Sequence, residues 1–373
     1  MIARELKLKR NRKLDREIEK SLWHLTGVYN WAIKTIRLRK NAGLGYSAFD
    51  LINLVSGHSK KSGLSSQAIT GTIFQAFNAW ERCWKGLGKA PRYKSVRNKL
   101  SSLQFPGDCK IDIPNSKIKL PKLGWIPFHS FTKGLPDGKI ASTVRVMKKA
   151  SGLYAVVVFK DAEHKQLIEG DSNSRVGVDT GFSELLTLSN GKVYEKPLEL
   201  LKSADQLAKV QRGSSKKKTA RLQEKIGRQR KDRNHKISHE IVHDHQAIFL
   251  TNDNLKGMAA GLFGKSVTSA GISQLRNFIL YKGRSVGRVV ELVESKNTTK
   301  TCSNCKALTG PTGLGKLNVR HWVCAGCGAS WQRDINASLN ILEAGERYSL
   351  DNLVSKVKTK LTKLKRTKPL SAA

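Results

Sequence analysis

RVGVDTG at residues 175–181, followed by LLTL at 185–188 and NGKVY at 190–194, is the stretch of this chain that decides its fold. Asn-Gly between two strand-like runs is the strongest short-range signal for a hairpin, so three short strands are predicted in quick succession. A long basic helix is predicted over 209–236, then a hydrophobic strand over 247–250, a further helix and a strand over 289–293. Three antiparallel strands, a helix and further strands are the order of an RNase H-like α/β fold.

The part of the chain before this stretch shows a different pattern. Residues 1–10 alternate apolar and basic side chains and predict a strand, whereas apolar side chains at three- and four-residue spacing from about Asp15 predict an amphipathic helix. A second helix is expected over 66–85, with loops between about 43 and 63. Short β-like runs separated by prolines, such as 118–120, 143–146 and 154–159, predict an antiparallel barrel into which the helical pair is inserted. The tryptophans of the two helices are expected mostly in the core, because they recur at helical spacing.

The composition points to a polyanionic partner. The 373 residues include 68 Lys and Arg against 29 Asp and Glu, a formal net charge of +39. So large a charge repels itself unless a polyanion neutralises it, and nucleic acid is favoured over an anionic membrane surface, for which no amphipathic anchor is evident. No run of about 18 apolar residues predicts a membrane span. The N-terminus has no secretory signal, so a cytoplasmic, nucleoid-associated protein is expected.

Four of the six cysteines form two Cys-x-x-Cys pairs. The pairs are separated by eighteen residues, a spacing at which two knuckles hold one Zn²⁺ in tetrahedral coordination. Four thiolates leave no open position for water, so the predicted zinc site is structural. His321 could replace one ligand, but the cysteine set is complete without it. The predicted ligands are Cys302, Cys305, Cys324 and Cys327, and Cys83 and Cys109 are expected to be core thiols.

Two aspartates stand out in so basic a chain. Asp179 ends the first strand of the deciding stretch, and Asp334 opens the helix that follows the second cysteine pair. Carboxylates that converge from strand ends suit Mg²⁺, and a pair of such ions can position an attacking water on a phosphodiester. A lone Asp at a strand end is more often a cap or turn residue, so the pattern alone leaves both interpretations open.

The stretches at 176–181, 297–305, 324–327 and 333–337 (VGVDTG, NTTKTCSNC, CAGC and RDINA) together resemble the TnpB family of transposon-encoded, RNA-guided DNA nucleases, which are related to type V CRISPR effectors. The resemblance extends over essentially the whole chain, although the N-terminal half matches only in layout. It implies a β-barrel (wedge) domain at 1–10 and 100–168, a helical recognition domain at 11–99 and a RuvC-like nuclease domain at 169–300 and 329–350. A zinc-finger insert for target nucleic acid at 301–328 and a basic flexible tail at 351–373 complete the expected division.

The family's nuclease centre implies Asp, Glu and Asp. Asp179 and Asp334 match the first and third, but Thr251 stands where the Glu is expected. Three alternatives remain open. Glu294, just after the strand at 289–293, supplies the carboxylate, as in some relatives; Asp253 supplies it from a turn whose composition favours local hydrogen bonds; or the nuclease is inactive. The first is preferred, which makes Asp179, Glu294 and Asp334 the predicted catalytic and magnesium-binding residues.

The predicted function is that of an RNA-guided DNA endonuclease. A guide RNA from the transposon end would pair with double-stranded target DNA, which is cut next to a short motif by Mg²⁺-dependent hydrolysis. The alternative is a nuclease-inactive, RNA-guided DNA-binding repressor, and a recombinase lacks an evident nucleophilic Tyr or Ser centre. Phosphate contacts are expected on the basic helix, with twelve Lys and Arg among residues 209–236. The candidates on that helix are Arg228, Arg230, Lys231 and Arg233.

Overall fold

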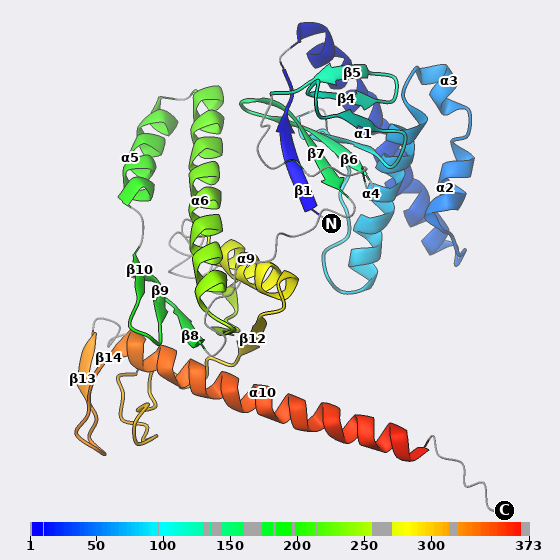
Figure 1. Ribbon diagram of the computed structural model, residues 1–373. Coiled ribbons are helices and arrows are strands. Elements are labelled where there is room, and N and C mark those ends of the chain that lie inside the picture. Colours follow the sequence, from blue (N-terminus) through cyan, green and yellow to red (C-terminus); the bar gives the residue numbers. More distant parts are fainter. Residues whose placement is uncertain are drawn as a thin grey trace, which may run out of the picture. The chain divides into compact units, whose positions relative to one another are not determined.

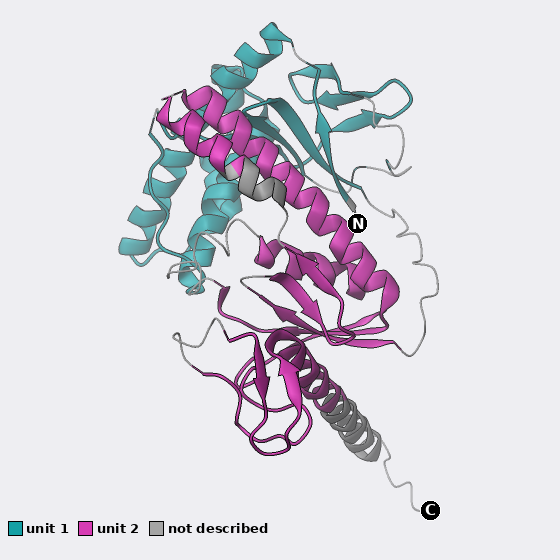
Figure 2. Ribbon diagram, turned by 90° about the vertical axis from the view of Figure 1, so that its left-hand side faces the viewer, with its two compact units in different colours: residues 1–163 teal, residues 164–373 magenta. Residues whose placement is uncertain are grey.

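The computed structural model divides the chain into two compact units, residues 1–163 and 164–373 (Figure 2). No helix in the described part of the chain is long and apolar enough to cross a membrane. Side chains are described as far as residue 349. The structure describes residues 2–9, 11–95, 97–129, 135, 140, 143–159, 174–181, 184–195, 198–213, 215–255, 271–312 and 319–366.

The described residues of the first unit form two antiparallel sheets and four helices, several of which are labelled in Figure 1. One sheet has the order β1-β7-β6-β2, formed by β1 (Ile2–Lys7), β7 (Gly152–Phe159), β6 (Val144–Lys149) and β2 (Ser102–Phe105). The other has the order β3-β4-β5, formed by β3 (Lys110–Asp112), β4 (Lys117–Leu120) and β5 (Gly124–Pro127). A bridge between Leu8 and Phe128 links the two sheets. The strands predicted in this half are confirmed, and their closure into a barrel stays a prediction.

The two predicted helices of this unit are α1 (Arg12–Asn41) and α4 (Ser66–Trp84). The side chain of Asn11 caps α1 by accepting from the backbone N–H groups of Lys13 and Leu14. The loops expected between them are wrong in part, because α2 (Ala48–Leu54) and α3 (His58–Ser62) lie there. The sequence carries the signal for α2, since Ser47 and Asp50 form a capping box.

The tryptophans of these helices do not share one environment. Trp80 is buried, as expected, but Trp23 is 56% exposed and Trp84 is 40% exposed. The core interpretation is therefore wrong for Trp23 and Trp84. Trp23 lies away from the buried face of α1, and Trp84 is the last residue of α4, beyond the buried Trp80 on the same face.

The second unit is built on a five-stranded sheet of order β10-β9-β8-β11-β12 (Figure 1). β8 pairs antiparallel with β9 and parallel with β11, and β11 pairs parallel with β12. The predicted succession along the chain, three antiparallel strands followed by helix and further strands of an RNase H-like fold, is present. Gly191, with φ +86°, occupies the hairpin turn between β9 and β10. The strands are β8 (Arg175–Thr180), β9 (Glu184–Leu188), β10 (Val193–Glu195), β11 (Ala247–Thr251) and β12 (Val289–Val293).

Helices cover both faces of this sheet. Val176, Val178 and Leu250 pack with side chains of α6 (Lys216–Asp244) and α9 (Ile272–Ser285), whereas Phe249 and Val293 pack against α10 (Arg333–Arg366). Two glycines let α10 approach closely. A Cβ on Gly177 would lie 2.1 Å from the Ser338 carbonyl oxygen, and one on Gly345 would lie 2.1 Å from the Phe249 ring. The start of α10 is thereby held against the face of β8 that carries Gly177 and Asp179.

The long basic helix predicted over 209–236 is wrong in its extent. Two helices cover this part of the chain, α5 (Leu198–Arg212) and α6, and Gly213 follows the end of α5. The charge pattern continues across the break, but glycine is disfavoured inside a helix and common just beyond its end. The basic tail at 351–373 lies outside the residues whose side chains the structure describes.

Candidate acidic centre and zinc site

Asp179 and Asp334 lie on the same side of the sheet in the second unit. Asp179 is two residues after Gly177 on β8, so its side chain leaves the strand on the face that α10 covers. Asp334 is the second residue of α10 and is only 7% exposed. Arg320 Nη1 donates to Asp334 Oδ2 over 2.9 Å, which fixes one oxygen of this carboxylate. The close approach of α10 to β8 therefore places the two predicted carboxylates near each other.

The pKa of Asp179 reflects this proximity. The pKa of Asp179 is raised to about 7, first by burial and then by the negative charges of Asp334 and Asp253. The pKa of Asp334 is also raised by burial, against the lowering effect of Arg320. Carboxylates that repel one another in a partly desolvated site offer the hard oxygen donors that Mg²⁺ prefers. The donor set therefore fits a divalent cation of this kind.

Asp253 joins this group although it lies in a turn. Asp253 Oδ2 accepts hydrogen bonds from Thr251 Oγ1 over 2.7 Å and from Thr180 Oγ1 over 3.0 Å. Val178 pairs with Leu250 in the parallel register of β8 and β11, which places Asp179 level with Thr251. The threonine at the expected glutamate position thus helps to hold a carboxylate that comes from two residues further on.

Glu294 lies directly after β12 and is exposed. In the register of β11 and β12, the residue level with Thr251 is Val293, whose side chain is buried with Phe249 and Ile341. Glu294 follows with the opposite parity, so the register does not align it with Asp179. The structure brings Asp179, Asp334 and Asp253 into electrostatic contact, and the role of Glu294 stays a prediction.

We expect Asp179→Asn to stabilise the metal-free protein. Its folded pKa of about 7 lies above the ordinary value of 3.8, so the folded state binds this proton more tightly than the unfolded chain does. The free energy of unfolding therefore falls as the pH rises from about 4 through 7. Asn cannot ionise, so the variant does not lose stability in this way. A gain of about 1 kcal/mol in the free energy of unfolding raises the melting temperature by about 2–4 °C in a unit of this size. Thermal melts in EDTA at pH 5 and pH 8 measure it.

The exposed Asp232 supplies the control for this prediction. Its carboxylate pairs with Lys236 on the surface of α6, so Asp232→Asn should shift the melting temperature little at either pH. An Asp179→Asn variant that melts at the same temperature as the parent at pH 8 would contradict the expectation.

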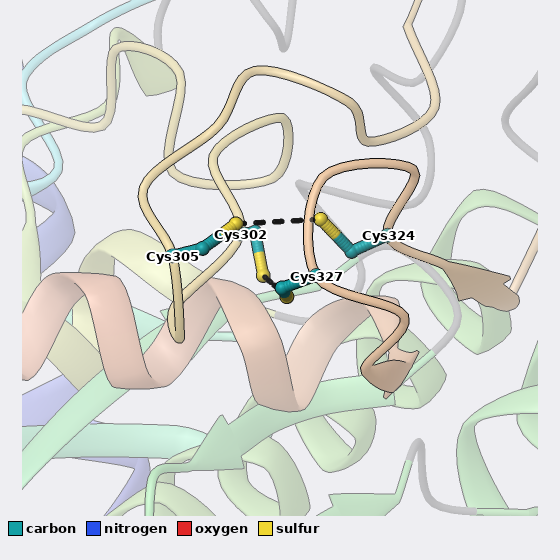
Figure 3. A group of neighbouring side chains, drawn as sticks. All are labelled: Cys302, Cys305, Cys324 and Cys327. Atoms are coloured by element: carbon teal, nitrogen blue, oxygen red, sulfur yellow. Dashed lines mark hydrogen bonds between the residues drawn. The ribbon is translucent and has the colours of Figure 1, made fainter.

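The four predicted zinc ligands converge in the second unit (Figure 3). Their sulfur atoms all lie within 4.8 Å of one another, with Cys302 Sγ 3.8 Å from Cys327 Sγ and Cys305 Sγ 3.5 Å from Cys324 Sγ. A tetrahedral site with Zn–S bonds of about 2.3 Å requires sulfur separations of about 3.8 Å. The geometry and the thiol donors therefore fit Zn²⁺.

Neighbouring side chains support the thiolate forms of Cys302 and Cys324. Trp331 Nε1 donates to Cys302 Sγ over 3.2 Å. A hydrogen bond with the Thr309 hydroxyl, 3.1 Å from Cys324 Sγ, is the main cause that lowers the pKa of Cys324 to about 6. His321 is exposed on β13 (His321–Val323) and lies outside the group of four sulfur atoms. The cysteines alone complete the site.

Two asparagines of α10 tie the cysteine loops to the acidic centre. Asn336 Oδ1 accepts from the backbone N–H of Ser303, and Asn336 Nδ2 donates to the carbonyl oxygen of Thr301 over 2.8 Å. Asn340 Nδ2 donates to the carbonyl oxygens of Thr298 and Thr301. Because Asp334 is the second residue of the same helix, the cysteine loops and this carboxylate are held on one element. The sequence analysis includes Asn336 only as part of the motif at 333–337 and does not single out Asn340, since nothing local assigns either side chain a contact with the cysteine loops.

The candidate phosphate contacts lie on α6. Arg228 forms an i,i+4 ion pair with Glu224, and Lys231 is exposed. Arg233 donates from Nε and Nη2 to Asn234 Oδ1, and the Arg230 side chain packs beside Gly271. These contacts anchor three of the four basic side chains on the helix without neutralising its overall charge.

The strand order of the second unit is that of an RNase H-like fold. The four converging cysteines add a zinc-ribbon-like insert to it. Two family models match within this unit. Residues 162–260 match the OrfB_IS605 model, described as "Probable transposase", and residues 273–341 match the model of the Cas12f1-like TNB domain. These matches support the similarity of this chain to the TnpB family.

Relatives match over most of the chain. A Streptomyces pristinaespiralis protein, provisionally named an RNA-guided DNA endonuclease, is 28% identical over 298 residues, which cover 76% of this chain and 72% of that protein. The TnpB-like protein L79 of Acanthamoeba polyphaga mimivirus is 27% identical over 208 residues, 48% of this chain and 39% of that protein. Among solved structures, Cas12f1 in its complex with sgRNA and target DNA aligns with a TM-score of 0.38 and 17% identity over 92% of this chain and 99% of that chain.

Proposed function

We propose that this protein is an RNA-guided DNA endonuclease whose RNase H-like unit cuts target DNA. The observation that carries this proposal is the convergence of Asp179 and Asp334 where α10 meets β8, in a chain similar to the TnpB family. The name of the Streptomyces pristinaespiralis relative supports the same activity. The net charge of +39 supports a polyanionic partner.

We propose Mg²⁺ as the catalytic metal, held by Asp179 and Asp334. When bound, the ion supplies the positive charge that lowers the pKa of the attacking water and stabilises the leaving oxygen of the phosphodiester. Arg320 orients Asp334 by binding Oδ2, which leaves Oδ1 to face a ligand. Without a cation, the negatively charged carboxylates repel one another, so the site favours a bound divalent ion.

The third carboxylate has two candidates, Glu294 and Asp253. Glu294 is the residue that the resemblance favours, in the place where some relatives supply the acid. The contacts favour Asp253, whose charge raises the pKa of Asp179 and whose Oδ2 is held by Thr180 and Thr251. These two hydroxyl groups leave Asp253 Oδ1 for a ligand, and we propose Asp253 as the stronger candidate.

We propose that guide RNA and double-stranded target DNA are the partners. The zinc-finger insert at 301–328 would contact target nucleic acid, and the basic face of α6 would contact phosphates through Arg228, Arg230, Lys231 and Arg233. The wedge domain at 1–10 and 100–168, the recognition domain at 11–99 and the nuclease domain at 169–300 and 329–350 are part of the same proposal.

The second candidate function is a guided DNA-binding repressor, which Thr251 favours because the family has a glutamate there. Cleavage of a plasmid target by the purified RNA complex in Mg²⁺ and in EDTA decides between the two. We expect linear product in Mg²⁺, none in EDTA and none from the double variant Asp179→Asn with Asp334→Asn. Guided binding of the target by the parent without any cleavage would support the repressor and overturn the nuclease.

A further inference from the structure

The exposed Trp23 lies in line with a second tryptophan on α1. Residues 23, 27 and 31 are separated by four positions, so they share one side of the helix. Trp31 is partly buried, and the residue between the two indoles is Gly27. The ring of His24 meets Trp23 edge-on at 4.9 Å, which restricts the orientation of the exposed indole.

Gly27 has no packing reason to be glycine. A Cβ built on it would meet no atom within 4 Å, and its backbone is helical. Glycine is nevertheless disfavoured relative to alanine in the middle of a helix. Because Gly27 has no side chain, the helix backbone is uncovered between Trp23 and Trp31, whose Cα positions are about 12 Å apart along the helix axis.

The hollow above Gly27 has the size of a ligand site. A cavity of about 680 Å³ is lined by this side of α1, by residues 54–58 and by Lys94, Ser95 and Lys99. Asn30 fixes its far wall, because its side chain donates to the Lys94 carbonyl oxygen and accepts from the Lys94 N–H, both over 2.8 Å. Small-molecule sites are typically clefts of roughly 300–1,000 Å³ lined by aromatic groups and a few polar ones.

The charge of the lining favours an anionic occupant. Lys61, Lys94 and Lys99 line the cavity, and none of its described lining residues is acidic. Lys99 already forms an ion pair with Glu19, so we consider Lys61 and Lys94 as the partners for an added negative charge. A flat aromatic surface beside ammonium groups is the arrangement that binds a nucleobase and its phosphate together.

We propose that the Trp23–Gly27–Trp31 slot holds one unpaired nucleobase, with its phosphate on Lys61 or Lys94. The base must be unpaired, because a base inside a duplex already stacks on its neighbours on both faces. The proposal rests on a nucleic acid being the partner, as proposed above, but not on cleavage. The proposal explains both the exposed Trp23 indole and Gly27, since both allow a planar ring to stack over the helix backbone.

The test compares short single-stranded oligonucleotides with abasic oligonucleotides of the same length and charge, by fluorescence anisotropy on the full chain. The parent should prefer the oligonucleotides that carry bases. Trp23→Ala should reduce this preference by about tenfold, the effect expected for the loss of one stacked base. Gly27→Leu should fill the slot and reduce it similarly. RNA and DNA versions identify which strand supplies the base.

Trp125→Ala is the matched control, since Trp125 is 49% exposed on β5 and does not line the cavity. It should retain the preference, and melting curves should show that Gly27→Leu remains folded. Equal binding of base-bearing and abasic oligonucleotides by the parent would overturn the slot, as would an unchanged preference in Trp23→Ala. A parent that binds no RNA at all would instead contradict the proposed partner, which keeps the two failures distinct.

Discussion

Asp179→Asn and Asp334→Asn should each abolish target cleavage while guided DNA binding persists. Each change keeps the size of the side chain but removes one of the charges that hold the cation. Loss of a residue that only supports a metal ligand typically costs about 10–100-fold in metal affinity or activity, so loss of a ligand itself should cost at least about 100-fold. Cleavage rates and gel-shift binding of the same RNA complex measure the two effects separately.

The same assay separates Asp253 from Glu294. If Asp253 supplies the third carboxylate, Asp253→Asn should reduce cleavage about as much as Asp179→Asn, and Glu294→Gln should cost little. Thr251→Val is the matched positioning variant, because it removes the hydroxyl that donates to Asp253 Oδ2 but keeps the volume of the side chain. We expect an intermediate loss from it, with weaker Mn²⁺ binding measured by calorimetry on the protein without DNA.

The opposite pattern of cleavage would assign the third carboxylate to Glu294. Full cleavage by Asp253→Asn together with none by Glu294→Gln would show that the carboxylate comes from the end of β12. Mn²⁺ binding that Asp253→Asn leaves unchanged would contradict the assignment even if the parent never cuts DNA. Asp232→Asn on α6 controls for the general loss of a negative charge.

Cys302→Ser combined with Cys324→Ser should remove the single zinc ion from the chain and unfold its cysteine loops. Structural zinc contributes about 10–16 kcal/mol of apparent binding free energy in small domains, more than the loops can recover from other contacts. Because Asn336 and Asn340 hold these loops on α10, the loss should also loosen the helix start that carries Asp334. Elemental analysis and the rate of proteolysis within 299–328 measure the effect.

Cys83→Ser with Cys109→Ser is the matched control, since both residues are cysteines of the first unit without a metal-binding partner set among the described residues. That variant should keep one zinc ion per chain. A parent without zinc, or a zinc content that the Cys302 and Cys324 changes leave intact, would contradict the site.

The strands and the convergence of the four cysteines were predictable because their signals are local. Asn190-Gly191 adopts a hairpin turn through its own backbone preferences, and the two-residue spacing of each cysteine pair is enough to bring two sulfur atoms to one ion. Asp179 was identifiable as a candidate site residue for the same reason, since it lies near the end of a hydrophobic run that has to be a buried strand. The prediction of a single helix over 209–236 was wrong at Gly213, because the same charge pattern continues from α5 into α6.

By itself, the sequence determined the order of the strands, the cysteine site and the basic character that calls for a polyanion. Only the tertiary structure decided which acids meet. Asp253 approaches Asp179 because the parallel register of β8 and β11 brings residues more than seventy positions apart to the same level, where Thr180 and Thr251 both bind its carboxylate. The same holds for the surroundings of Trp23, which lies away from the buried face of α1 and beside a cavity. Local patterns state which side chains share a face, whereas the neighbours of that face are set by packing between distant segments.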